Sequence, residues 1–305
     1  MSTLVEGAGG FLYGGATKGG TSNKGTFYKF NKTTNLIVAQ TSLDETTGRD
    51  PSRQLYIHTD GFLYAFTNKN ATSNVGSFVK INTVSMVLTL QATSFEGGSE
   101  VNTFTYDPIS NKLYAVAANG GLRTAGCGFK INLDGTSVEL VHQFLFHSEG
   151  SVPSKLAYAS ENSLLNNKIF GTCFTEGLYE RGSLFSLNPD VINSHKTIRQ
   201  FTIADGLQPS SVIVASNQKL YGTFKMQGTS GATSFSGSIF CVNPIDGSCT
   251  RIKGFIEPIT SLLQPNGGVI EATNGYLYGT ATLGGSNNIG GIYKIQKDGT
   301  NYQVV

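Results

Sequence analysis

The sequence predicts an all-β protein whose fold class is a six-bladed β-propeller of four-stranded antiparallel blades. Three observations lead to this prediction. A hydrophobic–aromatic pair occurs six times, and a glycine-led strand pattern follows each pair. The 305 residues include 38 glycines, and no stretch shows the sustained 3.6-residue period of an amphipathic helix. The repeat recurs every ~50 residues, which is typical of a propeller blade.

The repeated pair opens one strand of each unit and the glycine opens the next. The pairs are Leu12-Tyr13, Leu63-Tyr64, Leu113-Tyr114, Ile169-Phe170, Leu220-Tyr221 and Leu277-Tyr278. The following strands read GTFYKFN, GSFVKIN, GCGFKIN, GSLFSLN, GSIFCVN and GGIYKIQ. In five copies the aromatic residue and the lysine position lie 16 residues apart, as in Tyr13 and Lys29, whereas Tyr221 and Cys241 lie 20 apart. Near-constant spacing indicates one supersecondary unit repeated six times.

Four strands, named a to d, are expected in each unit. Strand a is short and apolar, and is expected at 3–6, 54–58, 102–106, 155–159, 211–215 and 268–272. Strand b begins with the aromatic pair and strand c with the glycine. Dipeptides such as Asp134-Gly135 suit the c–d turn because they tolerate positive φ. The link from strand d to the next strand a usually contains proline (Pro51, Pro153, Pro209, Pro265), as suits a connection between sheets.

The repeat runs through the chain without a linker, so a single domain is expected over 1–305. Its blades are expected at about 1–50, 51–99, 100–152, 153–208, 209–265 and 266–305, each from one continuous segment. A four-stranded sheet cannot bury its apolar face alone, and stacking one sheet on the next gives each an apolar neighbour. We expect the repeated aromatic to form the core between blades and the glycine after it to permit close contact.

Composition and charge narrow the function. Charged residues make up 14% of the chain and the formal net charge is +2, which argues against a nucleic-acid partner. No run of 18 apolar residues occurs, so membrane insertion is not expected. The N-terminus lacks the basic and apolar regions of a signal peptide. The neutral Asn-, Ser-, Thr- and Gly-rich surface nevertheless predicts an extracellular or virion-like particle protein, with sequons at Asn31 and Asn70.

The four cysteines allow two interpretations. Cys241 and Cys249 flank a predicted c–d turn, so they form either a hairpin disulfide or two reduced thiols on neighbouring strands. Cys127 and Cys173 occupy strand positions of small residues and are expected to be buried free thiols. No cysteine or histidine spacing indicates a zinc site.

The repeat resembles the GloVer tandem repeat, which has a Leu-Tyr-Gly-Thr core and a later Gly-x-x-Phe-Lys strand. The resemblance is strongest at 276–300 and 11–31, and it weakens where Ser186 and Cys241 replace the lysine. It covers the whole chain. It implies a propeller in a secreted or surface-attached protein, and it implies no reaction.

Ligand-binding residues are expected in the b–c loops, at the face where propeller sites generally lie. Most loops are short and rich in Gly, Ser and Asn, which either form a hydrogen-bonding rim or only satisfy turn geometry. The fourth loop gathers charge and the fifth is four residues longer, so a specialised sector is expected there. The candidate residues are Glu176, Tyr179, Arg181, Gln227, Ser230 and, in the sixth loop, Asn287.

No metal, cofactor or catalytic residue is expected. Glu149 and Asp205 lie four residues before a link proline, and Glu96 is a third such carboxylate if Glu100 takes the place of the proline. Carboxylates arranged in a ring can hold Ca²⁺, but no paired ligands accompany these three, so Ca²⁺ is not expected. Sialidase-like propellers use Trp-ended motifs, and this chain has no tryptophan. No nucleophile elbow or phosphate loop is present. His58 ends a predicted strand a, where a lone histidine is usually structural.

Taken together, these features predict a non-enzymatic structural or recognition module. It is expected to bind a protein partner or to self-assemble through its blade loops. A carbohydrate-binding, lectin-like propeller is the alternative, although the conspicuous tyrosines are assigned to the core. A glycan-active enzyme is the third possibility, since any two carboxylates could converge in the fold.

Overall fold

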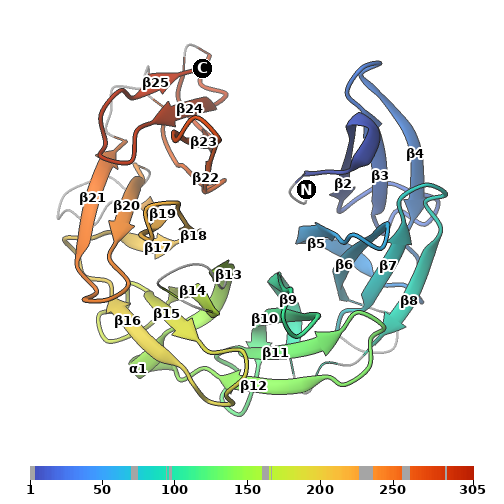
Figure 1. The fold of residues 1–305 in the computed structure, drawn as a ribbon, viewed down its shortest axis with the longest axis horizontal. Helices are drawn as coiled ribbons and strands as arrows, with labels where there is room; N and C mark the ends of the chain where they lie inside the picture. The colour runs from blue at the N-terminus through green and yellow to red at the C-terminus, as the bar shows by residue number, and fades with distance from the viewer. Residues whose placement is uncertain are drawn as a thin grey trace. The chain divides into compact units, whose positions relative to one another are not determined.

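The fold was analysed in a computed structural model that describes the chain except residues 1–3, 70–74, 94, 96–97, 160–164, 166, 227–235, 256–261 and 286 and the side chains of Arg53 and Lys69. The described residues form six antiparallel sheets with almost no helix (Figure 1). The fold is a six-bladed β-propeller, as predicted. The chain divides into two compact units, Met1–Gln143 and Phe144–Val305, each with three blades. That all six blades form one domain stays a prediction.

The first unit contains twelve described strands in three sheets of four consecutive strands. Blade 1 comprises β1 (Val5–Glu6), the 3₁₀ turn η1 (Ala8–Gly10), β2 (Phe11–Ala16), β3 (Thr26–Asn31) and β4 (Leu36–Ser42). Blade 2 comprises β5 (Arg49–Ile57), β6 (Phe62–Lys69), β7 (Phe78–Asn82) and β8 (Leu88–Ala92). Blade 3 comprises β9 (Gly98–Asp107), β10 (Lys112–Gly120), β11 (Cys127–Asn132) and β12 (Glu139–Gln143).

The second unit begins with a short helix, α1 (Phe146–Glu149), in the link to blade 4. Blade 4 comprises β13 (Ser151–Ala159), β14 (Lys168–Thr175), β15 (Ser183–Leu187) and β16 (Lys196–Gln200). Blade 5 comprises β17 (Leu207–Pro209) and β18 (Ile213–Val214), which both pair with β19 (Leu220–Met226), then β20 (Ser238–Val242) and β21 (Cys249–Gly254). Blade 6 comprises β22 (Val269–Glu271), β23 (Leu277–Ala281), β24 (Gly291–Ile295) and β25 (Gln303–Val304).

Strand register explains the 16-residue spacing of the sequence repeat. Tyr13 pairs directly with Lys29, and the same cross-strand pair recurs as Tyr64–Lys80, Tyr114–Lys130, Phe170–Ser186 and Tyr278–Lys294. Tyr221 also pairs with Cys241, although they lie 20 residues apart. The four additional residues of blade 5 therefore lengthen the loop and leave the ladder unchanged.

The glycine after the repeated aromatic makes room for a ring in its own sheet. A methyl group added at Gly279 would overlap the ring of Tyr293, its cross-strand partner, and one added at Gly171 would overlap Phe185. In blade 2 the pair is Ala65 and Val79, which is smaller and needs no glycine. The glycine was expected to allow close contact between neighbouring blades. Instead, it makes room for an aromatic ring of the adjacent strand in the same blade.

The apolar core lies between neighbouring blades of each unit. One cluster joins blades 1 and 2 around Tyr13, and another joins blades 2 and 3 around Tyr64. In the second unit, Phe170 lies in the cluster between blades 4 and 5, and Tyr221 in the cluster between blades 5 and 6. These aromatics are at most 2% exposed. The prediction that the repeated aromatic packs blade on blade is confirmed for these four.

Three of the four link prolines lie inside strand a, not between the sheets as expected, whereas Pro265 lies before β22 (Val269–Glu271). Pro51, Pro153 and Pro209 pair with residues of strand b, so β5, β13 and β17 each begin two residues before the expected blade boundary. The residue before each link proline has a left-handed backbone with φ of 54° to 56° (Asp50, Val152, Gln208 and Gln264). A residue before proline is sterically excluded from the right-handed helical region. The ladder shifts register nearby in β5 and β13, which marks a bulge.

All four cysteines are free thiols. Cys241 pairs with Thr250, and Cys249 pairs with Val242, so the two side chains point to opposite faces of the β20–β21 hairpin. Cys241 lies in the core between blades 5 and 6, while Cys249 packs against the core between blades 4 and 5. The disulfide that spacing allowed is therefore absent. Cys127 and Cys173 are buried, as expected, and burial raises the pKa of Cys127 to about 11.

Candidate functional site

The b–c loops of four blades share one backbone conformation. In each, the N–H of the last glycine donates to the carbonyl six residues earlier, at 2.8 to 3.2 Å (Gly25 to Gly19, Gly126 to Gly120, Gly182 to Glu176, Gly290 to Gly284). A second bond closes the tip at 3.1 to 3.3 Å (Asn23 to Gly20, Thr124 to Gly121, Glu180 to Gly177, Asn288 to Gly285). The loop glycines have positive φ, a conformation that glycine adopts without strain. They therefore serve the turn geometry, as one of the two interpretations of these loops expected.

Side chains of strand d hold the tips of three of these loops. Gln143 accepts from the N–H of Leu122 at 2.6 Å, and Gln200 accepts from the N–H of Leu178 at 3.1 Å. Ser42 does the same for Thr21 at 3.1 Å. A constant scaffold therefore presents different side chains at its tip. Leu122, Leu178 and Tyr179 are large, apolar and exposed there.

The residues predicted as ligand-binding lie on this scaffold but do not converge. Tyr179 and Asn287 occupy the same exposed loop position in blades 4 and 6. Glu176 takes the position of the first glycine, with φ of 60°, and its carboxylate lies 4.0 Å from His147. Arg181 is half-buried near the end of the same loop. Gln227 and Ser230 lie outside the described residues.

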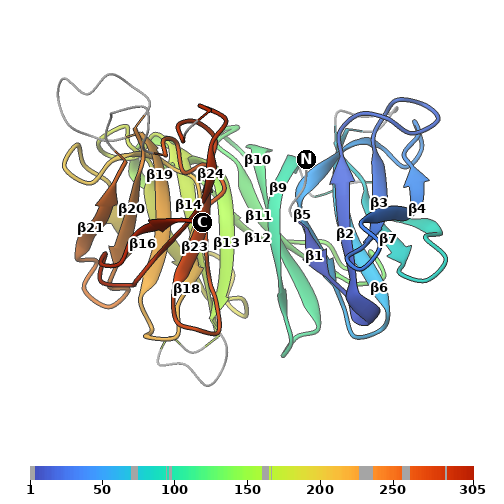
Figure 2. The ribbon, with the colours of Figure 1, turned by 90° about the horizontal axis from the view of Figure 1, so that it is seen from above.

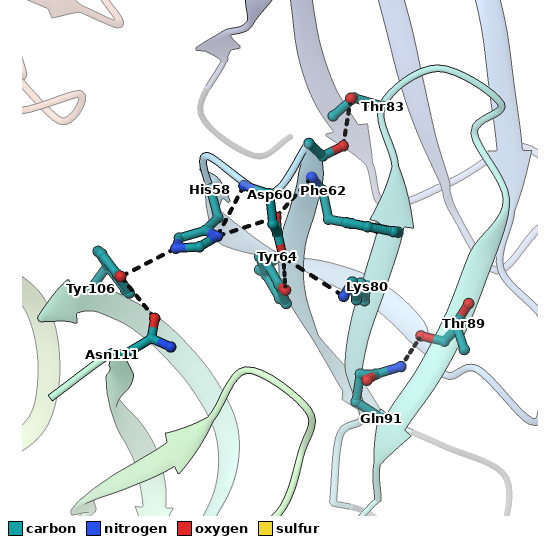
Figure 3. A network of polar contacts seen from close by, with 11 residues as sticks. His58, Asp60, Phe62, Tyr64, Lys80, Thr83, Thr89, Gln91, Tyr106 and Asn111 are labelled. Atoms are coloured by element: carbon teal, nitrogen blue, oxygen red, sulfur yellow. Dashed lines mark hydrogen bonds and ion pairs between the residues drawn. The ribbon is translucent and has the colours of Figure 1, made fainter. Parts of the chain in front are cut away.

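A second candidate site lies at the opposite end of the blades, where strands a and b meet (Figure 2). It joins the a–b turns of blades 2 and 3, and it was not predicted from the sequence. Figure 3 shows its residues, which we call the His58 cluster: His58, Asp60, Tyr64, Lys80, Tyr106 and Asn111. The side chains of His58, Asp60 and Lys80 are 14%, 32% and 25% exposed, so solvent reaches the cluster.

Local structure places Asp60 at the centre of this cluster. After β5, the N–H of Gly61 donates to the His58 carbonyl at 3.1 Å and closes a tight turn. Asp60 Oδ1 accepts from the N–H of Phe62 at 3.0 Å, which fixes the carboxylate over the start of β6. Asp60 Oδ2 then accepts from the Tyr64 hydroxyl at 2.7 Å. Lys80, the cross-strand partner of Tyr64, lies 3.7 Å from the same oxygen.

His58 connects this turn to blade 3. The Tyr106 hydroxyl donates to Asn111 Oδ1 at 2.8 Å, so its oxygen accepts from His58 Nε2–H at 3.1 Å. His58 Nδ1 lies 3.2 Å from both the N–H and Oδ1 of Asp60. Neutral imidazole accepts from that N–H, and imidazolium donates to that carboxylate. His58 Nδ1 thus has a hydrogen-bond donor and a carboxylate oxygen of the same residue within reach.

Aromatic rings surround the polar groups. Tyr56 stacks on Tyr106 with ring centroids 4.9 Å apart and 24° between planes, and His58 meets Tyr106 edge-on at 5.1 Å. Lys80 Nζ lies 3.8 Å from the centre of the Phe62 ring, which is a cation–π distance. An aromatic platform beside hydrogen-bonding groups of both kinds is suited to a polar ligand with apolar faces.

The surroundings of these groups keep the carboxyl group charged and the phenols neutral. Burial opposes ionisation of Asp60, but hydrogen bonds from Tyr64, Phe62 and His58 outweigh it and hold its pKa below the usual value. Burial raises the pKa of Tyr56 to about 12, and that of Tyr106 also rises, with nearby carboxylates adding to the effect. These phenols stay protonated at neutral pH. The cluster therefore combines one carboxylate with neutral phenols, whose hydroxyls donate to Asp60 and Asn111.

A Ser–Lys–Glu group lies at the same strand ends in blades 5 and 6. Lys297 donates to Ser216 Oγ at 2.8 Å and to Glu271, and Ser216 donates to Glu271 through N–H and hydroxyl, each at 2.7 Å. Beside it is an open hollow of about 560 Å³ with an apolar side formed by Ile213, Val214 and Ile270. Lys297 forms an ion pair with Glu271 at 2.5 Å.

Two of the link carboxylates, Asp205 and Glu149, have protein partners among the described residues. Asp205 is buried and accepts from Arg199 Nη2 at 2.8 Å and Nε at 3.2 Å. Glu149 accepts from the N–H of Leu145 at 3.0 Å and lies 3.4 Å from His195. Glu96 lies outside the described residues.

Comparisons with solved structures show the fold alone. The extracellular domain of a putative one-component system from B. thetaiotaomicron matches at 13% identity with a TM-score of 0.64, covering 100% of this chain and 33% of that one. A putative 6-phosphogluconolactonase from Bacteroides fragilis matches at 15% and 0.62, covering 99% and 82%. The PQQ-bound aldose sugar dehydrogenase of Streptomyces coelicolor matches at 12% and 0.56, covering 96% and 92%.

Sequence comparison assigns the family. No curated protein matches the chain. Within the described part, no helix is long and apolar enough to cross a membrane. The Gloeobacter/Verrucomicrobia repeat matches residues 1–165 and 112–305, which together cover the whole sequence. With six Leu-Tyr-Gly-type strands in constant register, this chain belongs to the Gloeobacter/Verrucomicrobia repeat family.

Proposed function

We propose that this propeller is a non-enzymatic recognition module that binds a protein partner through its b–c loops, outside a cell or on a particle surface. The observation that carries the proposal is the constant loop scaffold with variable tips. Interfaces are enriched in aromatic and arginine side chains and depleted of other charges at their centre. Leu122-Arg123 and Leu178-Tyr179 supply such side chains at equivalent positions. The extracellular source of one structural neighbour supports the location.

Site-specific photo-cross-linking in an extract of the native source tests this proposal. A photoreactive residue at Tyr179 or at Leu122 is expected to form an adduct with another protein. The same residue at Ile245, which is 78% exposed at the other end of blade 5, is expected to form none. Absence of adducts at both loops, or equal adducts at all three positions, would refute loop-mediated binding.

A tip exchange separates the tip side chains from the loop backbone. Replacing Leu178 and Tyr179 with Ser and Asn copies the tip of the sixth-blade loop, whose hydrogen bonds are the same. We expect unchanged folding and loss of the adduct made by a reporter at the neighbouring Glu180. An adduct that survives the exchange would assign recognition to another surface.

A second candidate function is carbohydrate binding, and the His58 cluster favours it. The stacked Tyr56 and Tyr106 lie beside the Asp60 carboxylate and the Lys80 ammonium, a combination that can contact both the ring face and the hydroxyls of a sugar. A glycan array compares wild type with Asp60→Ala. Binding that the substitution abolishes would support this function, and an array with no signal would exclude it.

A further inference from the structure

Five exposed aliphatic side chains lie on the fourth strands and c–d turn of blades 1 and 2. They are Leu36 (62% exposed), Val38 (49%), Val84 (83%), Val87 (60%) and Leu90 (38%), and we call them the outer patch. Leu36 and Val38 are residues of β4, while Leu90 lies on β8. In Figure 1, β4 and β8 are the outermost strands of two neighbouring blades. Contiguous exposed apolar surface of this kind marks an interaction site.

Contacts between the two blades show that these residues share one surface. The carbonyl of Thr83, next to Val84, accepts from the Tyr13 hydroxyl and from Lys29 Nζ, each at 2.9 Å. Lys29 is the cross-strand partner of Ala39 on β4, next to Val38. Met86, between Val84 and Val87, is buried in the core cluster against which Ala39 packs. The c–d turn of blade 2 therefore contacts β2 and β3 of blade 1, and its buried Met86 belongs to the cluster against which Ala39 of β4 packs.

The segments that carry the outer patch contain no charged residue. Neither Thr33–Leu43 nor Ile81–Phe95 contains a single Asp, Glu, Lys or Arg. The equivalent segments of the other blades are charged: Asp134 and Glu139 in blade 3, Lys196 and Arg199 in blade 4, and Arg251 and Lys253 in blade 5. Charges on edge strands are the usual protection against association. Blades 1 and 2 lack that protection where the others have it.

We propose that the outer patch is a homodimer interface that binds the same patch of a second copy of this chain. In a two-fold interface each residue meets its own surface, so any charge would face a like charge nearby. This patch has none to repel, and uncharged Thr33, Thr34, Thr89 and Gln91 border it. An apolar centre within a neutral polar rim is the usual anatomy of an interface. A charged partner would instead require complementary charge here.

Side-chain packing, not a continuous sheet, is the expected form of this contact. Both β4 and β8 are edge strands in the described sheets, so unpaired backbone groups are available. Each strand, however, shifts register by one residue against its neighbour, at Val38 and at Gln91. Such bulges twist an edge away from further pairing. The apolar side chains are therefore the groups that hold the two copies together.

Sedimentation equilibrium across a protein concentration series tests the proposal. Wild type is expected to reach twice the monomer mass by the ~100 μM range, and Val84→Glu is expected to remain a monomer there. The matched control is Ile245→Glu, because Ile245 has the same place in the c–d turn of blade 5: its N–H donates to Asn243, as that of Val84 donates to Asn82. Ile245 is 78% exposed beside Asp246, so this variant should dimerise like wild type.

Three results would overturn the homodimer. Wild type could be monomeric throughout the series, Val84→Glu could dimerise as wild type does, or Ile245→Glu could dissociate equally. Leu36→Glu on β4 provides a second variant, so that one misfolded protein does not decide the outcome. The loop function is independent of this result, because the cross-linking positions Tyr179 and Leu122 lie in b–c loops and outside the outer patch.

Discussion

The a–b turns of blades 2 and 6 have the same backbone and different chemistry. In blade 2 the N–H of Gly61 donates to His58 at 3.1 Å, and in blade 6 that of Gly275 donates to Ala272 at 2.9 Å. Asp60 and Asn274 then cap the next strand in the same way. The hydrogen bond to the repeated tyrosine is reversed, however. Tyr64 donates to the Asp60 carboxylate, whereas the Asn274 amide donates to Tyr278.

This comparison separates what the fold needs from what a site needs. Blade 5 has the same arrangement as blade 6, with Asn217 donating to Tyr221 at 3.0 Å. A neutral amide therefore satisfies the turn. Asp60 introduces a charge, and His58 stands where blades 5 and 6 have Ala215 and Ala272. Blade 2 thus differs from blades 5 and 6 at two positions of the same turn, Asp60 and His58, and these two residues give the His58 cluster its charge and its imidazole. Substitutions at either position can therefore change the chemistry of the cluster while the turn is kept.

The largest effect is expected where the two blades differ in strand b, at Gly279 and Ala65. Gly279→Ala places a methyl group in the fully buried ring of Tyr293, so we expect a loss of about 3 kcal/mol in the free energy of unfolding. Urea denaturation measures it. In a Tyr293→Val background, which recreates the Ala65–Val79 pair of blade 2, the same substitution should cost less than about 1 kcal/mol. Equal losses in both backgrounds would show that the ring is not the obstacle.

A smaller effect is expected when blade 2 is given the neutral cap of blade 6. Asp60→Asn removes a charge-assisted hydrogen bond but keeps a capping amide, so the loss at pH 7 should be about 1 kcal/mol. The folded pKa of Asp60 lies below its ordinary 3.8. Its stabilisation is therefore complete above about pH 4 and is lost as pH falls through the folded value. The gap between wild type and variant should close over that range in urea titrations. A gap independent of pH would contradict this assignment.

The fold could be predicted because the spacing within the sequence repeat reflects a pair of residues that face each other on neighbouring strands. Sixteen residues separate Tyr13 from Lys29 since the hairpin between them has a fixed register, and six such hairpins specify six blades. The longer fifth copy keeps the pair of Tyr221 with Cys241. The link prolines were placed outside the sheets because their left-handed neighbours, such as Val152, leave no sequence signal. Whether Cys241 and Cys249 form a disulfide could not be decided from their spacing. The answer depends on the register of β20 and β21, which puts the two side chains on opposite faces of the hairpin.

The candidate site could be predicted only in part. The b–c loops were predicted as the binding site because they are rich in Gly, Ser and Asn. Residues of these types stabilise the backbone conformation of the loops, as the hydrogen bond from the Gly126 N–H to the Gly120 carbonyl shows. The His58 cluster joins residues 48 apart in sequence, His58 and Tyr106, from two blades, and no local motif reports that contact. One signal was available. Asp60 lies four residues before the repeated tyrosine, where blades 5 and 6 have asparagine.

The smallest effect is expected from His58→Ala, which copies Ala272 of blade 6. Because the ring is partly exposed, water can replace much of its bonding, and the loss should be about 0.5–1 kcal/mol. A double-mutant cycle with Tyr106→Phe tests whether the histidine links blades 2 and 3, and coupling of about 0.5 kcal/mol is expected. Tyr158→Phe is the matched control. Its hydroxyl donates to Asn167 at 2.9 Å, as that of Tyr106 does to Asn111, and it belongs to strand a of blade 4. Additive losses in the Tyr106 cycle, or equal coupling to Tyr158, would show that the histidine does not join the two blades.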